Sequence, residues 1–249
     1  MSTENSSLAK MLALLEAFTK DRHMWTVEAM AEHFGYTHSS TYRYVRELCR
    51  AGLLVRMPNG EYVIGARIVV LEALIRQADP LTKACMPMLD NFTRLLGCHA
   101  LLSNAYGEHL INVVHLPGND DIELAFVGGR QLPWFRGATS RAILAFLPRK
   151  RVRKLFEKNY EGERDKLNWR QTLGLLNEVS DQGFCISREE LQKGVVGVGA
   201  PLIVSGDVLG SVTLVFSTAH SQLLDLPAVG RNLIEGCTQS MSTLDCAVD

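Results

Sequence analysis

A helix, a short turn, a second helix and a hairpin follow one another between residues 26 and 65. Thr26 can cap the first helix, and Gly35 stands where a helix often ends in a left-handed residue. Thr37 can cap the second helix, which closes at Gly52. Two helices separated by so short a turn are typical of a helix-turn-helix, so the second helix is predicted to be a recognition helix.

The hairpin signal lies directly after this helix. Residues 53–57 and 61–65 alternate apolar and polar side chains around Asn59-Gly60, a dipeptide that favours a tight hairpin turn. Another helix is predicted before the pair, capped by Ser6 or Ser7, with an apolar face of Leu8, Met11, Leu12, Leu15 and Phe18. Helix, helix-turn-helix and two-stranded wing together predict a winged helix-turn-helix that reads duplex DNA.

The recognition helix has an inward and an outward side. Thr41, Val45 and Leu48 share the side that is predicted to pack inward. In such domains, residues near the start of the helix reach base edges, and flanking polar groups contact the phosphates. The predicted DNA-contacting residues are Thr37, Ser39, Ser40, Tyr42, Arg43, Arg46, Arg50 and, near the tip of the wing, Arg56. The alternative is that these side chains only form a solvated helix face.

Charge and composition limit the partners and the compartment. The net charge of −1 excludes a polycation that coats nucleic acid, so DNA binding must come from local charge. No apolar run approaches the roughly 20 residues that span a bilayer, and the polar N-terminus lacks a signal-peptide pattern. We therefore expect a cytoplasmic protein with no membrane partner. The six cysteines and seven histidines are scattered without metal-ligand spacing, so neither a metal nor a cofactor is expected.

The length of 249 residues allows two domains. An apolar helix predicted at residues 66–78 stops before Asp79-Pro80, because proline disfavours helix in the residue before it. This helix is too apolar to stand alone in water, so a second copy of the chain is its expected packing partner. The expected organisation is a DNA-binding domain at residues 1–65, a linker helix at 66–79 and a second domain at 80–249.

The second domain has helix-like and strand-like groups in turn. Helices are predicted at residues 81–96, from near 139 to 147, and at 149–158, 169–183 and 228–244. Strands are predicted at residues 99–105, 108–116, 122–127, 195–204 and 208–216, with turns at 128–130 and 205–207. Short hairpin links imply an antiparallel sheet with helices packed against it, so the expected class is α+β.

Several segments together resemble one known family. Ser39-Ser40-Thr41-Tyr42-Arg43, followed by Leu48 and Ala51-Gly52-Leu53, is similar to the recognition helix of IclR-family transcriptional regulators and its exit. The match continues in the second domain with Gly129, Pro133, Ala142-Ile143-Leu144-Ala145, Gly194-Val195, Ala200-Pro201-Leu202 and Val208-Leu209-Gly210. The resemblance covers residues 6 to about 245, and it depends on the order and spacing of these motifs.

The resemblance implies a function and an assembly. It implies a transcriptional regulator rather than an enzyme, with a GAF-like effector-binding domain after the winged helix-turn-helix. It also implies a homodimer or a dimer of dimers, and a small organic or aromatic acid met in catabolism as the effector. Carried over position by position, the effector-binding residues are Arg136, Gly137, Ala138 and Thr139 in one wall and Ser187, Val196, Gly197, Thr213 and Val215 in the other.

The predicted pocket departs from the family pattern. Its loop reads Arg136-Gly-Ala-Thr-Ser-Arg141, where small residues followed by Gly-Lys are common, so no effector can be copied from a relative. The Arg136 guanidinium could pair with an effector carboxylate, or the backbone N–H groups at the helix start near Thr139 could bind it instead. Trp134 and Phe135 could stack on an aromatic ring, and core packing is their other interpretation.

Two other classes of protein stay open at this point. One is a DNA-binding protein whose second domain only forms oligomers and binds no ligand. The other is an enzyme with a regulatory DNA-binding head, which would need a reactive constellation in residues 80–249. The carboxylate pair Glu189-Glu190 has no nucleophile or metal cluster beside it in the sequence, and we interpret it as a pair of solvated turn residues.

Overall fold

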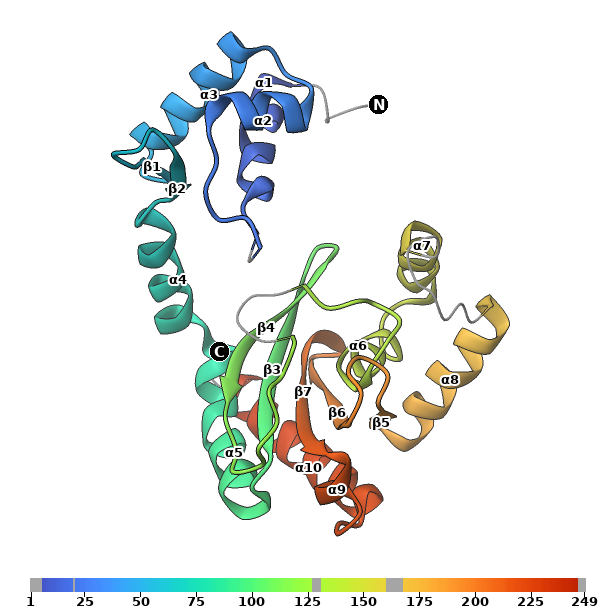
Figure 1. Cartoon of the computed structure of the whole chain (residues 1–249). Helices are drawn as coiled ribbons and strands as arrows, with labels where there is room; N and C mark the ends of the chain where they lie inside the picture. The colour runs from blue at the N-terminus through green and yellow to red at the C-terminus, as the bar shows by residue number, and fades with distance from the viewer. Residues whose placement is uncertain (1–5, 20, 127–130, 160–167, 246–249) are drawn as a thin grey trace. The chain divides into compact units, whose positions relative to one another are not determined.

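The chain divides into two compact units, Met1–Asp79 and Pro80–Asp249 (Figure 1). The structure is a computed structural model that describes residues 6–19, 21–126, 131–159 and 168–245. The predicted turn at 128–130, with Gly129 of the family match, lies outside the described residues. Within the described ranges, no helix combines the length and the apolar character that crossing a membrane requires.

The first unit is a winged helix-turn-helix followed by one more helix (Figure 1). Its elements are α1 (Ser7–Ala13), the 3-10 helix η2 (Leu14–Ala17), α2 (Val27–Phe34), α3 (His38–Arg50), β1 (Leu54–Arg56), β2 (Tyr62–Ile64) and α4 (Arg67–Ala78). The predicted caps are confirmed, because Ser6, Thr26 and Thr37 each accept a hydrogen bond from a backbone N–H in the first turn. β1 and β2 pair antiparallel and form the predicted wing.

The interior of the first unit corrects the predicted apolar face of the first helix. Leu8 and Leu12 are 69% and 52% exposed, whereas Leu14 is fully buried. Met11, Leu15 and Phe18 of that face do pack against the core, so the prediction is wrong for Leu8 and Leu12 alone. The chain tightens from α1 into η2 at Leu14, which changes the direction of the side chains that follow. Trp25 pairs with Tyr62 across an isolated bridge, which joins the wing to the helical part.

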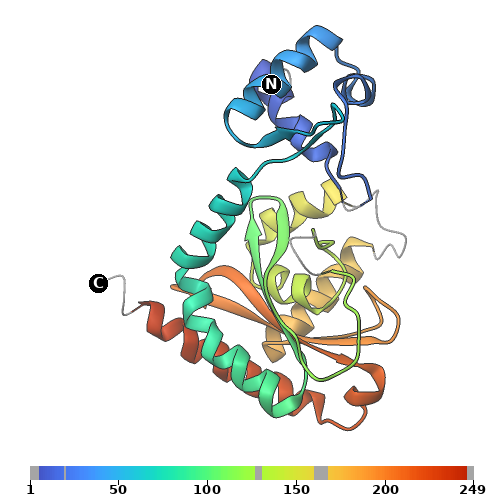
Figure 2. The same ribbon diagram turned by 60° about the vertical axis from the view of Figure 1, so that its left-hand side comes forward.

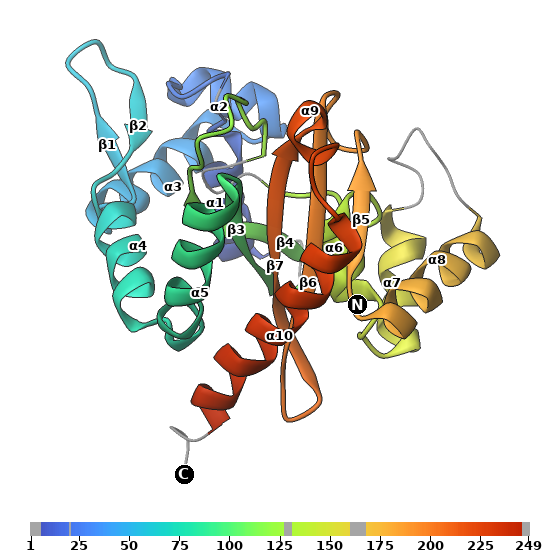
Figure 3. The same cartoon turned by 90° about the horizontal axis from the view of Figure 1, so that it is seen from below.

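The second unit is an antiparallel sheet with helices on both faces, as expected for the α+β class (Figures 2 and 3). Its strands are β3 (His99–Tyr106), β4 (His109–Leu116), β5 (Cys185–Arg188), β6 (Val195–Val204) and β7 (Asp207–Ser217), in the order β4-β3-β7-β6-β5. Its helices are α5 (Pro80–Leu96), α6 (Ala138–Leu144), α7 (Arg149–Asn159), α8 (Trp169–Gln182), α9 (Thr218–Ser221) and α10 (Leu226–Asp245).

The predicted strand at residues 122–127 is wrong over its described part. Residues 122–126 pair with no strand of the sheet. Their backbone groups instead form hydrogen bonds with the side chains of Gln192 and Asn112. Because side chains from distant parts of the chain satisfy this backbone, its apolar sequence could not reveal that it lies outside the sheet.

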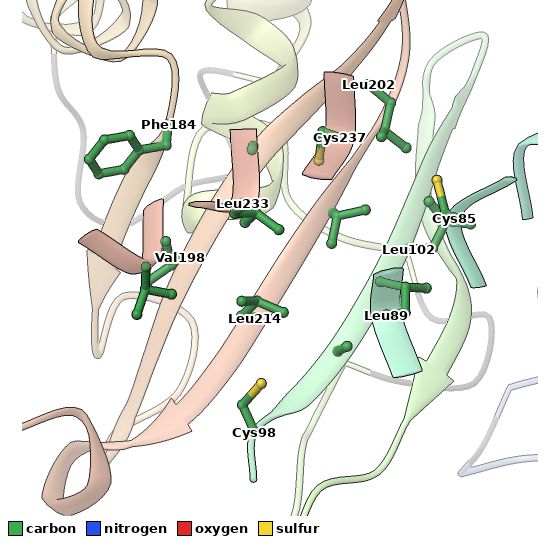
Figure 4. Packing of buried hydrophobic residues seen from close by; sticks show 14 of the residues in the cluster. Cys85, Leu89, Cys98, Leu102, Phe184, Val198, Leu202, Leu214, Leu233 and Cys237 are labelled. Carbon is green, nitrogen blue, oxygen red and sulfur yellow. The ribbon is translucent and has the colours of Figure 1, made fainter. Parts of the chain in front are cut away.

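The two faces of the sheet carry different kinds of side chain. Helices α5 and α10 cover one face, and α6, α7 and α8 lie on the other (Figures 2 and 3). On the first face, Leu89 of α5, Leu233 of α10 and Leu214 of β7 belong to one hydrophobic core (Figure 4). On the second face, a Cβ on Gly199 would lie 2.9 Å from the carbonyl oxygen of Ala138. The absence of a side chain at Gly199 therefore lets α6 lie directly against the sheet.

Candidate functional site

The polar side of α3 is open to solvent. Ser39, Tyr42 and Arg43 are exposed, Tyr42 by 53%. The opposite side is buried by the predicted residues Thr41, Val45 and Leu48 and also by Tyr44. The sequence reasoning missed Tyr44, whose ring packs edge-on against Tyr36 with centroids 6.4 Å apart. The contact between Tyr36 and Tyr44 lies on the buried side of α3, opposite the polar side that faces solvent.

The first turn of α3 uses two of the predicted contact residues for capping. Thr37 Oγ1 accepts from the Ser40 backbone N–H at 3.3 Å and donates to Ser40 Oγ at 2.9 Å. His38 of this turn lies 3.0 Å from Glu28 of α2. That hydrogen bond is the main reason why the pKa of Glu28 falls to about 2. The pair joins the two helices of the helix-turn-helix, and no local signal in the sequence marked it.

The two remaining arginines of α3 share one carboxylate. Arg46 and Arg50 approach Glu47 Oε1 at 3.3 and 3.0 Å, and all three side chains are more than 40% exposed. Exposed ion pairs contribute at most about 1 kcal/mol, so phosphate groups could replace Glu47 as the partner of these arginines. Arg56 ends β1 and is exposed beside the turn of the wing. Arg43, Arg46, Arg50 and Arg56 are therefore exposed cations on α3 and on the wing.

A cavity of about 60 Å³ lies in the second unit, between α6 and the sheet. It brings together six of the residues predicted to bind an effector, namely Ala138, Thr139, Ser187, Gly197, Thr213 and Val215. Thr139 Oγ1 and Thr213 Oγ1 lie 2.8 Å apart and share a hydrogen bond. The cavity therefore combines apolar walls with hydroxyl groups that already have partners.

Three of the nine predicted effector residues, Arg136, Gly137 and Val196, do not line the cavity. Val196 is 1% exposed and packs into the hydrophobic core on the α5 and α10 face. Its assignment to the pocket was wrong because strand side chains alternate, and its neighbours Val195 and Gly197 are the ones that line the cavity. Arg136 does not line the cavity, and its guanidinium donates to the backbone carbonyl oxygen of Glu190.

The carboxylate of Glu190 lies at the start of α6, which the sequence reasoning did not foresee. Its Oε2 accepts from the Gly137 N–H at 3.1 Å, and its Oε1 accepts from Arg141 Nη1 at 2.6 Å. The next N–H, that of Ala138, donates to Ser187 Oγ at 3.0 Å. Glu190 and Ser187 therefore already occupy two of the backbone N–H groups that we expected near Thr139 to bind an effector carboxylate. The interpretation of Glu190 as a solvated turn residue is wrong.

Gln192 holds the segment that was predicted to be a strand. Its Oε1 accepts from the Ala125 N–H at 2.8 Å, and its Nε2 donates to the Glu123 carbonyl oxygen at 2.7 Å. Asn112 Nδ2 donates to the carbonyl oxygen of Phe126. We call residues 122–126 the strap, since side chains of its residues 124–126 line the cavity.

Two family models together match most of the chain. The family described as "IclR helix-turn-helix domain" matches residues 7–58. The family described as "Bacterial transcriptional regulator IclR C-terminal" matches residues 74–242. The chain belongs to the IclR family. The resemblance identified from the sequence is therefore confirmed, and the IclR family consists of transcriptional regulators rather than enzymes.

Curated relatives and solved structures agree with this IclR membership. The chain is 25% identical to the HTH-type transcriptional regulator KipR of Bacillus subtilis, over 81% of this chain and 82% of KipR. It is 27% identical to the p-hydroxybenzoate hydroxylase transcriptional activator of Acinetobacter baylyi, over 80% and 76% of the two chains. The fold matches that of the IclR transcriptional regulator from Alicyclobacillus acidocaldarius, with a TM-score of 0.79, 19% identity and coverage of 96% and 97%.

One further IclR structure carries a ligand. It is an IclR homolog from Microbacterium hydrocarbonoxydans complexed with 4-hydroxybenzoate. Its TM-score to this chain is 0.76 at 18% identity, and the match covers 97% of this chain and 100% of the homolog. At this identity the likeness establishes the shared fold alone.

A histidine pair joins β3 to β4 at the edge of this IclR effector domain. His99 Nε2 lies 2.8 Å from the carbonyl oxygen of Asp120, which can only accept, so this nitrogen carries the proton. In the neutral pair, His99 Nδ1 therefore accepts from His115 Nε2 at 3.1 Å. The Asp120 carboxylate binds His220 Nδ1 at 3.1 Å. Among the described residues no group of three or more histidine, cysteine or acidic side chains could hold a metal ion.

Acid is expected to destabilise this IclR chain partly through His115. Burial, and then the charge of His99, lower the pKa of His115. The folded state therefore binds fewer protons than the unfolded state, and stability is lost as the pH falls below the ordinary histidine pKa of about 6.5. We expect His115→Gln, which can still donate to His99, to lose less free energy of unfolding between pH 8 and pH 5 than the original chain. Urea denaturation at each pH measures the free energy of unfolding. The control is His23→Gln, which changes an exposed histidine. Parallel plots of this free energy against pH for all three chains would contradict the prediction.

Proposed function

We propose that this IclR-family regulator binds a pseudo-palindromic operator through α3 and the wing, and that a small organic or aromatic acid controls its affinity. The observation that carries the proposal is the exposed side of α3, where Ser39, Tyr42 and Arg43 stand at the start of a recognition helix. Side chains in these positions reach base edges when the helix lies in the major groove. Arg46, Arg50 and Arg56 are placed to contact phosphates, and the capping pair Thr37 and Ser40 to orient the first turn.

The effector part of the proposal rests on the cavity beside α6. Its apolar walls suit an aromatic ring, and the hydroxyls of Thr139, Ser187 and Thr213 suit hydroxyl or carboxylate groups. Two curated relatives support the aromatic acid class, since one is named for p-hydroxybenzoate hydroxylase and another for the Pca regulon. The homolog structure with 4-hydroxybenzoate supports it too. We infer that the genes controlled belong to a catabolic operon and that the chain works in the cytoplasm.

The assembly part of the proposal rests on α4. This helix exposes large apolar side chains around most of its circumference, namely Ile68, Val69, Val70, Leu71, Leu74 and Ile75. An exposed apolar surface of this kind marks an interaction site, and a second copy of the same helix would cover part of it in a two-fold dimer. A dimer places two recognition helices one helical turn of DNA apart, or a multiple of it.

A second candidate is a regulator whose C-terminal unit only forms oligomers. The observation that favours it is the cavity volume of about 60 Å³. An engineered protein cavity that binds benzene has a volume of about 150 Å³, so this cavity is too small for an aromatic ring as it stands. An acid with a ring can enter only if side chains or the strap move. Ligand-induced stabilisation separates the two candidates, because a ligand that binds only the folded state raises Tm.

Replacing Arg43 with alanine is expected to weaken binding to an operator selected from random duplex DNA by about 5- to 150-fold, or about 1–3 kcal/mol. The sequence preference should relax at one base position in each half-site, because a base contact is lost. Fluorescence anisotropy against selected and single-base-changed duplexes measures both effects. Arg56→Ala should weaken all duplexes alike and reduce the salt slope by about 1.

The matched control is Arg231→Ala on α10, which removes one exposed positive charge outside the proposed DNA face. This variant should bind like the original chain. Unchanged affinity and unchanged sequence preference in Arg43→Ala would refute the assignment of the recognition helix. Complexes that contain one chain on a full palindromic site would refute the dimer.

A further inference from the structure

The Arg141 guanidinium, which contacts the cavity-lining Glu190, is already paired with a carboxylate of the chain itself. Arg141 donates from Nη1 to Glu190 Oε1 at 2.6 Å, and Glu190 Oε2 accepts from the Gly137 N–H at 3.1 Å. The two side chains are only 15% and 25% exposed. A guanidinium and a backbone N–H that converge on two oxygens form a subsite that fits any carboxylate. Glu190 fills that subsite from within.

The negative charge of Glu190 limits where an acid could bind in the cavity. Of the described residues that line the cavity, only Glu190 carries a charge, and the charge is negative. A ligand carboxylate placed beside an unmoved Glu190 would meet a like charge in a partly buried place, which is unfavourable. The volume of about 60 Å³ leaves no room beside Glu190 for a ring with a carboxylate. An acid that is to bind Arg141 and the Gly137 N–H must therefore take the place of Glu190.

The neighbours of Glu190 connect this subsite to both walls of the cavity. Leu191 packs on the loop before α6, since a Cβ on Gly137 would lie 2.6 Å from Leu191 Cδ1. Gln192 forms two hydrogen bonds with the backbone of the strap. Three consecutive residues, Glu190 to Gln192, thus hold the α6 loop and the strap together. If Glu190 leaves its subsite, the contacts of Leu191 and Gln192 with both walls change with it.

We propose that Glu190 is an internal competitor of the effector. A monocarboxylic acid binds by taking the place of the Glu190 carboxylate on Arg141 and on the Gly137 N–H. Glu190 then turns out of the cavity and loosens the hold of Gln192 on the strap. The proposal rests on the proposed function in one respect, which is that the effector is an acid.

The exchange explains why the ligand must be an anion, and two carboxylate oxygens match the two donors that Glu190 leaves. Turning Glu190 away leaves the partly buried guanidinium of Arg141 without its acidic partner, which is strongly unfavourable unless another anion replaces it. A carboxylate restores both hydrogen bonds, whereas a neutral amide of the same shape restores no charge. The competition also lowers the observed affinity for the acid, because only the fraction of molecules with an open subsite can bind it.

Chemical rescue of Glu190→Ala in the full chain tests the subsite without knowledge of the effector. The variant should lose roughly 3–6 °C in Tm, because Arg141 loses its partner. Saturating sodium acetate should restore at least about half of that loss relative to sodium chloride at equal ionic strength, through binding to the folded state. Acetamide should restore none of it. The original chain should gain no Tm from acetate, and neither should Glu178→Ala, a surface carboxylate control on α8.

A second variant and a second ligand separate this proposal from the proposed function. Glu190→Gln keeps the size of the side chain, so it remains informative if Glu190→Ala does not fold, and acetate should stabilise it more than the original chain. In Glu190→Gln, 4-hydroxybenzoate should bind about tenfold more tightly than in the original chain, and 4-hydroxybenzamide should bind neither.

The outcomes are distinct. Equal effects of acetate and acetamide on both Glu190 variants would overturn the competitor role, even if an effector acid is found by other means. Rescue by acetate without any stabilisation by 4-hydroxybenzoate or other aromatic acids would support the subsite and count against the aromatic acid effector of the proposed function. Weaker binding of 4-hydroxybenzoate to Glu190→Gln than to the original chain would assign Glu190 to ligand binding and overturn the proposal.

Discussion

Replacing Trp134 with alanine is expected to lower the free energy of unfolding of the C-terminal unit by about 3–5 kcal/mol. Trp134 is 1% exposed and packs in the hydrophobic core between α6, α7 and α8. Its Nε1 donates to the carbonyl oxygen of Glu108 at 2.7 Å. The change removes a large apolar surface, leaves a cavity and deprives a partly buried carbonyl group of its donor. Urea denaturation followed by circular dichroism measures the loss.

Trp169→Ala is the matched control for this change. The Trp169 ring is half-buried, packs against Phe156 and lies 4.9 Å from the guanidinium carbon of Arg153. Its removal should cost less than half as much, because solvent already reaches one side. Equal losses in the two variants would contradict the core role of Trp134. A stable Trp134→Ala chain that no longer responds to aromatic acids would instead support the stacking role that the sequence left open.

Replacing Gly210 with valine is expected to cost at least about 4 kcal/mol and to leave the C-terminal unit without its native sheet. Gly210 lies in β7 and pairs with Asn104 of β3 and Leu202 of β6. A Cβ there would lie 2.2 Å from the carbonyl oxygen of Ser103 and 2.9 Å from Asn104 Oδ1. Because the first of these atoms is backbone, the strands themselves would have to move apart. Near-ultraviolet circular dichroism and limited proteolysis measure the loss of packing.

Gly174→Ala is the control for Gly210→Val. Gly174 lies within α8, and a Cβ there would meet no other atom within 4 Å. Alanine is the better helix former, so this variant should gain up to about 1 kcal/mol. If Gly210→Val keeps native proteolytic resistance, the close approach of β3 and β7 is not a requirement of the fold.

Local signals explain why the winged helix-turn-helix could be predicted from the sequence. Caps such as Thr26 and Thr37, the left-handed Gly35 and the Asn59-Gly60 turn each act within a few residues. The structure departs from the predicted apolar face at Leu8 and Leu12 of α1, since which side chains a helix buries depends on the packing of the whole unit.

The candidate pocket shows what local signals leave out. Its position beside α6 followed from the family resemblance, but Glu190 did not, because its partner Arg141 is 49 residues away. The strap was mistaken for a strand because Gln192, 67 residues after Ala125, takes the hydrogen bond that a neighbouring strand would take. Only Val196 could have been excluded from the sequence, by counting alternate residues along its strand.

The carboxylate of Glu47 between Arg46 and Arg50 has a consequence for how such a protein searches a genome. Its negative charge opposes the phosphates of every duplex equally and weakens binding to random DNA as much as to the operator. Time spent on random sites then falls, while discrimination, which depends on contacts with the bases, is unaffected. A regulator present in few copies gains from this, because shorter stops on unrelated DNA leave more molecules free to find the operator.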